Sequence, residues 1–417
     1  MDRTLEDNQS TVVRLLNLEE FERVLKIAEN NKSIEKLLKL RKLSVGNGQL
    51  HNMGSDTYKQ KIKLLRKDGK EYEESFIVKE VPSHPLVRSH LLKQGLYERE
   101  VKYYTEVFPL MEELIANAGI NVEKLWPECI GCDPNQYVIL EDLSRSGYIV
   151  HPLDKLMDLE HSLLCTTAIA RLHALSIILV EQGLLNESPV LKQSYVGRKS
   201  GSIATAMKAH FSSLYNLFSQ WGTEWKNLGK QLVDNADALL VKYSNICQPS
   251  STSLNVLNHG DLWLGNIMFK YCKITGKPTG IKLIDYQLSH FTSYALDLHY
   301  ILRISSKDYI YKKHYQQLLA IYRETVLNTF KQFNFQPTKP FPSLDEINKE
   351  IDCKKLYPLM VSVYISPRMY EKTRNAMTKE LSVFQDKNLI EKLMDIDEYR
   401  IRIKEIFEPY LGCNLLE

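Results

Sequence analysis

HGDLWLGN at residues 259–266, followed by IDYQ at residues 284–287, is the stretch that decides the fold of this sequence. Asp261 and Asn266 lie five positions apart on one turning loop, so their side chains can point into the same cleft. Asp285 ends the partner strand of a hairpin, 24 residues after Asp261, and reaches that cleft from beside it. Phosphoryl transfer needs such a set, because a carboxylate must orient a hydroxyl and oxygen ligands must hold Mg²⁺.

A lysine that neutralises nucleotide phosphates is the next requirement, and Lys79 is placed to supply it. Lys79 ends an apolar, strand-like run that begins at Phe76, as expected for a side chain buried along its stem with its ammonium group at a cleft. A carboxylate should fix this lysine, and Glu100 on the following helix is the natural partner. Glu98 is the rival, since two residues apart on a helix point to opposite faces.

The pattern along the chain predicts a small sheet-containing front and a large helical back. An apolar stripe predicts helix over 18–42. Asp68-Gly69 between the strand-like runs 58–64 and 75–81 predicts a hairpin. A helix over 88–118 and a buried strand over 137–140 follow. Further helices are predicted over 153–184, 202–221, 223–245, 308–335, 344–365 and 387–411, with a hairpin set into them between 254 and 291.

Composition excludes several classes of protein. The chain has 417 residues, 44% of them hydrophobic and 25% charged, so it can bury a sizeable core and is not disordered as a whole. The net charge of +3 gives no reason to expect nucleic acid or an anionic membrane surface as a partner. No uncharged apolar window reaches about 18 residues, so we expect no membrane span.

The cysteines and the first residues indicate the compartment. Seven cysteines, an odd number, are scattered through the chain, which is typical of reduced thiols in a cytoplasmic protein. The polar start MDRTLEDNQS has no apolar stretch of the kind a signal peptide needs. Cys129 and Cys132 have C-x-x-C spacing, but no second pair completes a zinc site, and ordinary buried thiols are the favoured interpretation.

The motifs together resemble a known family. They are IVK at 77–79, LEDL at 140–143, LHALS at 172–176, and the two stretches quoted first. In this order they are similar to the insect ecdysteroid-kinase-like family, also described as choline-kinase-like (CHK), within the protein-kinase-like superfamily. The resemblance runs from about residue 40 to about residue 410. A metal-loop Asp followed by Tyr-Gln, and the absence of an activation-loop signature, argue against a protein kinase.

The resemblance implies a two-lobed α+β fold. It has a small antiparallel-sheet N-lobe and a large, mainly helical C-lobe. We expect an N-terminal helical extension over 1–42, the N-lobe over 43–143, and the C-lobe with its catalytic and metal loops over 144–417. The strand at 137–140 would run into the connection between the lobes.

The same resemblance assigns roles to individual residues. Asp261 would be the catalytic base, and Asn266 and Asp285 the Mg²⁺ ligands. The nucleotide-binding set would consist of Lys79 with Glu100, the connection residues Glu141 to Leu143 facing the adenine, and a phosphate-covering turn around Gly54 and Ser55. Asp297 would brace the catalytic loop.

The implied reaction is ATP- and Mg²⁺-dependent phosphorylation of a hydroxyl group. The acceptor would be an ecdysteroid or a similar lipophilic alcohol, with a choline- or aminoglycoside-type substrate as the runner-up. A kinase-like binder without activity is the alternative from a different class. A pure binder, however, has no physical need for Lys79, Asp261, Asn266 and Asp285 together. Oligomeric state is left open.

Several other residues near these motifs have a plainer interpretation. We expect His173 to be a satisfied core histidine and His259 to brace its loop. Trp263 either packs or walls the acceptor pocket, and Gly265 adds backbone freedom before Asn266. Tyr300, Tyr364 and Tyr370 could line a substrate cleft, although packing is the better expectation for each.

Overall fold

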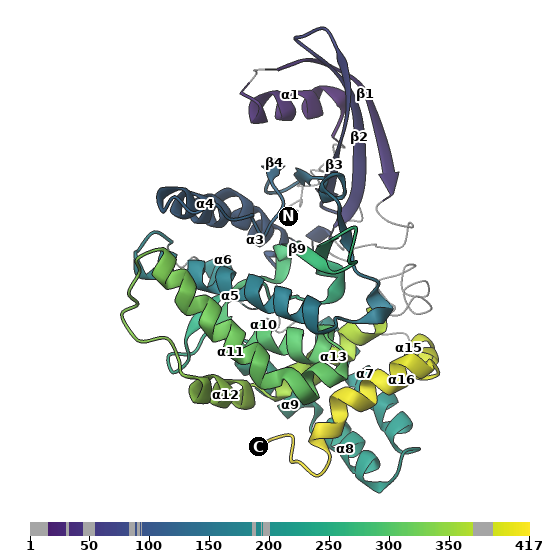
Figure 1. Ribbon diagram of the computed structural model, residues 1–417. Helices are drawn as coiled ribbons and strands as arrows, with labels where there is room; N and C mark the ends of the chain where they lie inside the picture. The colour runs from purple at the N-terminus through teal and green to yellow at the C-terminus, as the bar shows by residue number, and fades with distance from the viewer. Residues whose placement is uncertain are drawn as a thin grey trace, which may run out of the picture. The chain divides into compact units, whose positions relative to one another are not determined.

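The computed structural model describes residues 16–30, 33–44, 55–82, 88–89, 92, 94–185, 189–192, 194, 201–369 and 387–417 (Figure 1). By its internal packing the chain divides into two compact units. Unit 1 is formed by the described parts of residues 1–90 and 128–142. Unit 2 is formed by those of residues 91–127 and 143–417.

Unit 1 is built on an antiparallel sheet with the strand order β1-β2-β3-β5-β4. Helix α1 (Leu18–Ala28) packs against β1 and β4. Its Phe21 and Val24 lie in one buried apolar cluster with the inward side chains of the sheet. The strands are β1 (Ile34–Ser44), β2 (Asp56–Arg66), β3 (Glu71–Glu80), β4 (Cys129–Asp133) and β5 (Tyr137–Glu141).

The predicted hairpin and buried strand of unit 1 are confirmed. Strands β2 and β3 pair in continuous register from Asp56↔Glu80 to Leu65↔Glu71, and Gly69 turns the chain between them at a positive φ of 76°. Strand β5 then pairs with β3.

The helix predicted over 18–42 is wrong in its second half, which is strand β1. Two irregularities in the β1–β2 register, at 34/36 and 37/39, each insert one extra residue. Ile34, Leu37 and Leu40 therefore reach the same face at a spacing of three residues, which imitates a helix. The segment is part of the sheet rather than a helical extension.

Unit 2 is mainly helical. Helix α3 (Leu96–Lys102) continues through a π-helical turn (Tyr103–Val107) into α4 (Phe108–Asn117), so the helix predicted over 88–118 is confirmed from Leu96 to Asn117. These residues pack with unit 2, whereas the sequence analysis grouped them with the sheet. The other helices are α5 (Leu159–Glu181), α6 (Pro189–Lys192), α7 (Gly201–Phe218), α8 (Thr223–Asp234), α9 (Ala236–Ile246), α10 (Ala295–His299), α11 (Asp308–Gln332), α12 (Leu344–Cys353), α13 (Leu356–Ile365), α15 (Lys387–Met394) and α16 (Asp397–Phe407).

Two small antiparallel sheets lie among these helices. One has the order β6-β8-β9, formed by Tyr148–Val150, Ile267–Tyr271 and Pro278–Leu283. The other pairs β7 (Asn255–Asn258) with β10 (His290–Ser293). The predicted hairpin is thus β8–β9, and β7 and β10 flank it in the sequence. The motif at 259–266 lies between β7 and β8.

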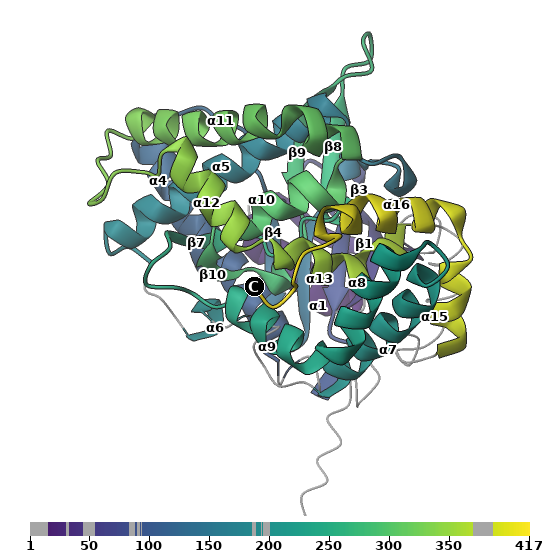
Figure 2. The same cartoon turned by 90° about the horizontal axis from the view of Figure 1, so that it is seen from below.

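The long helix α5 is largely buried in unit 2 and runs beside α11 (Figures 1 and 2). In the described part of the chain it is the one helix long and apolar enough to cross a membrane. However, 72% of its most apolar window is buried inside the protein, as in the core helix of a globular protein. Arg171 lies within this helix, so the segment holds no uncharged apolar window of about 18 residues.

Candidate active site

Gly260 opens the loop that carries the motif, and its backbone requires glycine. Gly260 adopts φ = 78°, a left-handed conformation that other residues rarely adopt. A Cβ atom there would lie 2.5 Å from the carbonyl oxygen of Leu288. The close approach lets the loop pass directly over the segment between β9 and β10.

Asp297, on α10, is hydrogen-bonded to the start of the loop at 259–266. Its carboxylate accepts hydrogen bonds from the backbone N–H groups of His259 (2.7 Å) and Gly260 (2.9 Å). It also bonds His173 Nε2 at 3.2 Å, while His173 Nδ1 bonds the hydroxyl of Tyr322 at 2.9 Å. Asp297 and His173 are fully buried. The expected roles of these two residues, a brace and a satisfied core histidine, are confirmed.

His259 also braces the loop, as expected. Its Nδ1 accepts from the backbone N–H of Asp261 at 3.3 Å, and its Nε2 donates to the carbonyl of Ile284 at 3.1 Å. Both bonds fit the tautomer that carries its proton on Nε2. The imidazole therefore links the catalytic loop to the residue before Asp285.

The carboxylate of Asp261 is nearly buried and is held at both oxygens. Asn266 Nδ2 donates to Asp261 Oδ2 at 3.0 Å and also to the Asp261 carbonyl at 2.9 Å. The Tyr300 hydroxyl donates to Asp261 Oδ1 at 3.0 Å. An ionised carboxylate is an acceptor at both oxygens, which is the property that a group orienting a substrate hydroxyl requires.

The two predicted Mg²⁺ ligands are brought together by the backbone. The N–H of Ile284 donates to the carbonyl of Asn266 at 3.0 Å, which fixes Asp285 beside the loop. Asp285 has φ = 70° and ψ = 74°, a strained conformation for a residue with a side chain, and such strain is concentrated at functional sites.

The donor set at this point fits Mg²⁺. Because Nδ2 of Asn266 is engaged with Asp261, its Oδ1 is the atom left for a cation, and Asp285 adds a carboxylate. Mg²⁺ is usually held by one or two protein oxygens, with phosphates and water completing its octahedron. In the described residues no three or more His, Cys, Asp or Glu side chains gather into a metal-binding cluster.

Gly265 is needed for a reason that the sequence did not indicate. A Cβ atom at this position would lie 2.4 Å from the indole ring of Trp263. Trp263 is buried against the loop, so it packs over Gly265. Of the two interpretations of Trp263, the structure favours packing.

Glu100 is the buried acid of its helix. Glu100 is fully buried and accepts from Gln287 Nε2 at 3.1 Å, whereas the rival Glu98 is exposed. Arg99 Nη1 donates to the Gln287 carbonyl at 2.8 Å. Helix α3 is therefore hydrogen-bonded to Gln287, which lies two positions after Asp285. Lys79 belongs to the other unit, and its pairing with Glu100 stays a prediction.

The remaining predicted nucleotide residues are divided between the units. In unit 1, Lys79 is buried on β3, and buried Ser55 bonds the Thr57 hydroxyl at 2.8 Å. Gly54 lies outside the described residues. The N–H of Glu141 is bonded to the Glu128 carbonyl at 2.9 Å. Leu143 begins a 3₁₀ turn (Leu143–Ser146) in unit 2.

Asp142 anchors the end of β5, a role that the sequence analysis did not assign. Its carboxylate accepts from the Ser75 hydroxyl at 2.5 Å and from Lys59 Nζ at 2.9 Å. The connection that follows Glu141 is thereby fixed to β2 and β3.

Tyr300 was expected to pack in the core, yet it contacts the predicted base, Asp261. The sequence contained one indication of this contact. Tyr300 follows Asp297 by three residues on one continuous helical segment, so the two side chains share a face. A residue on the face that braces the loop is a candidate to reach Asp261. The side chain of Tyr364 and all of Tyr370 lie outside the described residues.

Removing the hydroxyl of Tyr286 should stabilise the protein. Tyr286 follows Asp285; its ring stacks on Tyr103 and meets the edge of Phe108, with centroids 5.3 Å and 4.8 Å apart. Its hydroxyl is buried and has no hydrogen-bond partner in the described part of the chain. We expect Tyr286→Phe to raise the free energy of unfolding by about 1 kcal/mol. Thermal unfolding measures this.

The matched control for Tyr286→Phe is Tyr322→Phe, which removes a buried hydroxyl that is bonded to His173. Its midpoint of thermal unfolding should fall. Equal falls in both variants would mean that the Tyr286 hydroxyl has a partner after all.

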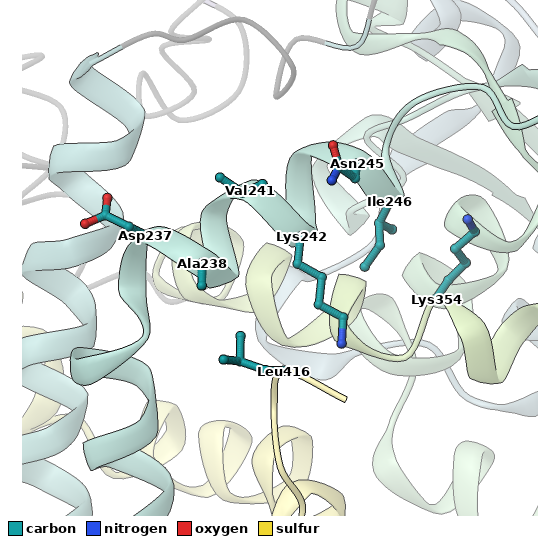
Figure 3. A pocket seen from close by; sticks show the side chains of 8 residues that line it. All are labelled: Asp237, Ala238, Val241, Lys242, Asn245, Ile246, Lys354 and Leu416. Atoms are coloured by element: carbon teal, nitrogen blue, oxygen red, sulfur yellow. The ribbon is translucent and has the colours of Figure 1, made fainter.

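A groove of about 660 Å³ lies elsewhere in unit 2 and contains none of the predicted site residues (Figure 3). It runs along α9, and Lys354 and Leu416 complete its wall. The candidate active site is therefore identified by its hydrogen bonds rather than by this groove.

A loop braced by a buried aspartate, the neighbouring Asn266 and Asp285, and the small antiparallel sheet are the features expected of a kinase-like protein with an α+β fold. The chain belongs to the ecdysteroid kinase-like family, whose model matches residues 49–335. By class it is a small-molecule phosphotransferase-like protein. The match is shorter than the range of about 40 to 410 expected from the motifs.

Comparisons with other proteins are more distant. The solved GDP complex of wild-type aminoglycoside 2′-phosphotransferase-IIIa shares 12% sequence identity with the chain. The alignment covers 94% of this chain and 99% of that one, with a TM-score of 0.40. No curated protein matches the sequence.

Proposed function

We propose that this protein transfers the γ-phosphoryl group of ATP to a hydroxyl group of a small molecule in a Mg²⁺-dependent reaction. The observation that carries the proposal is the arrangement around Asp261. One carboxylate is fixed by Tyr300 and Asn266, and Asp285 is tied to the same loop through the Ile284–Asn266 backbone bond. Family membership supports the same class of reaction.

The chain's own residues supply positioning and charge. Asp261 aligns the acceptor hydroxyl toward the γ-phosphorus and takes up its proton as the new P–O bond forms, while ADP leaves. Asn266 and Asp285 are the residues that would hold Mg²⁺, which when bound screens the phosphate oxygens. Catalysis of this kind depends mainly on orientation and electrostatic stabilisation.

Nucleotide recognition in this proposal uses residues of unit 1 together with Glu100 and Leu143 of unit 2. Lys79 neutralises phosphate charge, and Glu100 is its proposed partner. The backbone of Glu141 to Leu143 faces the adenine, and Gly54 and Ser55 cover the phosphates. The rigid attachment of Asp142 to β2 and β3 supports the role of the connection, because it fixes the adjoining backbone.

The acceptor in this proposal is an ecdysteroid or another lipophilic alcohol. Family membership is what supports this choice. Choline and aminoglycosides are alternative acceptors, and the test below distinguishes them. The structure describes all seven cysteines and joins none of them in a disulfide, which supports a reducing, cytoplasmic location.

The test is an acceptor screen with a catalytic blank. Purified protein is incubated with Mg-ATP and a panel of ecdysteroids, choline, ethanolamine, sugars and aminoglycosides, with Asp261→Asn protein in parallel. Mass spectrometry detects any compound that gains one phosphoryl group. We expect a steroid phosphate that is absent from the blank. A phosphorylated amine or sugar would change the acceptor class but keep the reaction. No product, together with no stabilisation by Mg-ATP on heating, would overturn the proposal.

A further inference from the structure

Tyr300 lies where α10 gives way to a π-helical segment (Tyr300–Ser305). Wide π-helical turns are rare and often mark functional sites. The side chain of Tyr300 is fully buried, and its hydroxyl donates to Asp261 Oδ1 at 3.0 Å. A buried phenol that donates to a nearly buried carboxylate makes a charge-assisted hydrogen bond, which is among the stronger kinds.

The two oxygens of Asp261 are held from two separate parts of the chain. Asn266, on the catalytic loop itself, bonds Oδ2, whereas Tyr300, on the helical segment after Asp297, bonds Oδ1. One bond alone would let the carboxylate turn about its Cβ–Cγ bond. Two bonds to different oxygens fix the plane of the carboxylate and so the direction in which it accepts a substrate hydrogen bond.

The segment that carries Tyr300 is itself fixed. The Ser305 hydroxyl donates to the Leu262 carbonyl at 2.7 Å, so the segment holds the catalytic loop at a second point. Arg402 of α16 donates from Nη2 to the carbonyls of Ile304 and Ser306, each at 3.0 Å. These bonds satisfy carbonyl groups at the end of the π-helical segment, where the regular helix pattern stops.

We propose that Tyr300 is a positioning residue for the transfer reaction, which orients Asp261 through its hydroxyl. The inference rests on the proposed function, because it assigns Tyr300 a part in that same reaction. It makes Tyr300 a determinant of kcat rather than of substrate binding, since the hydroxyl acts on Asp261 and not on the ligands.

The experiment compares wild type with Tyr300→Phe, which removes the hydroxyl and keeps the ring. Initial rates give kcat and the KM values for Mg-ATP and for the best acceptor, or kcat and the KM for Mg-ATP alone if only ATP hydrolysis is seen. We expect kcat to fall about tenfold or more with both KM values within about twofold of wild type. Tyr294→Phe is the matched control, because Tyr294 is also buried, at the start of α10, with its ring stacked on Tyr322. It should keep full kcat.

Two further measurements separate positioning from a structural role. In an Asp261→Asn background, Tyr300→Phe should lower the residual rate by less than twofold, because the two residues act as one unit. Replacement of Tyr300 by 3-fluorotyrosine keeps the hydroxyl and should keep kcat within about threefold. This variant preserves the test even if Tyr300→Phe fails to fold.

The possible results are distinct. A kcat unchanged in Tyr300→Phe overturns the inference alone, and so does an undiminished loss in the Asp261→Asn background. A 3-fluorotyrosine protein as slow as Tyr300→Phe also overturns it. A wild-type protein that neither phosphorylates any acceptor nor hydrolyses Mg-ATP overturns the proposed function, and the inference with it.

Discussion

Asp261→Asn is expected to lower turnover about a thousandfold while leaving the Kd of Mg-ATP within about threefold of wild type. Removal of a positioned general base typically costs 10²–10⁴ in rate. The asparagine has nearly the same shape, and its amide oxygen can still accept from Tyr300, while its N–H₂ group faces Asn266 Nδ2 and that one hydrogen bond is lost. Steady-state kinetics gives the turnover, and nucleotide titration gives the Kd.

The control for this prediction is Asp237→Asn, a surface carboxylate of α9 that lines the distant groove. It should leave both quantities unchanged. If Asp261→Asn kept more than about a tenth of the activity, Asp261 would not be the base. A large loss of nucleotide binding would instead place Asp261 among the nucleotide ligands.

Asp297→Asn is expected to destabilise unit 2 by about 3 kcal/mol or more. The fully buried carboxylate accepts from two backbone N–H groups and bonds His173. An amide in its place turns an N–H₂ group toward one of these donors and leaves a buried group unsatisfied, which costs far more than a surface substitution. Denaturant unfolding measures the change in free energy.

Asp158→Asn is the matched control, because asparagine caps a helix as well as aspartate does. Asp158 caps the N-terminus of α5 and is half-buried. Its substitution should change the free energy of unfolding by less than about 1 kcal/mol. Equal losses in Asp297→Asn and Asp158→Asn would contradict the bracing role.

The same residue predicts how stability depends on pH. Burial alone would raise the pKa of Asp297, but the hydrogen bond and charge of His173 and the N–H of Gly260 lower it below its ordinary value. A carboxyl with a lowered folded-state pKa contributes stability that is present above its unfolded-state pKa and is lost as pH falls through the folded-state pKa. Wild type should therefore lose more stability than Asp297→Asn when the pH is lowered below about 4.

The sequence predicted the elements whose periodicity is regular and local. The β2–β3 hairpin was found because Asp68-Gly69 marks its turn and the strands on both sides pair without interruption. Strand β1 was mistaken for helix because two register irregularities change its spacing from two residues to three. Such irregularities depend on the partner strand, so the segment read in isolation does not reveal them.

For the candidate site, spacing within the catalytic loop was informative, whereas contacts between distant segments were not. Asp261 and Asn266 are five residues apart and are hydrogen-bonded, as a single turning loop allows. Gly265 was read as backbone freedom, but the ring of Trp263 decides its identity. Tyr300 reaches Asp261 from 39 residues away, and its helical spacing from Asp297, which the sequence analysis did not use, is the local signal that relates it to the loop.

The most direct test of the central claim follows the γ-phosphoryl group itself. ATP labelled at the γ-phosphate is incubated with wild-type and Asp261→Asn protein, with and without Mg²⁺, in the presence of the acceptor panel. We predict label in an organic product with wild type and Mg²⁺ only, with one ADP formed for each phosphoryl group transferred. Label that stays in ATP under every condition, or that moves equally with Asp261→Asn protein, would contradict the account.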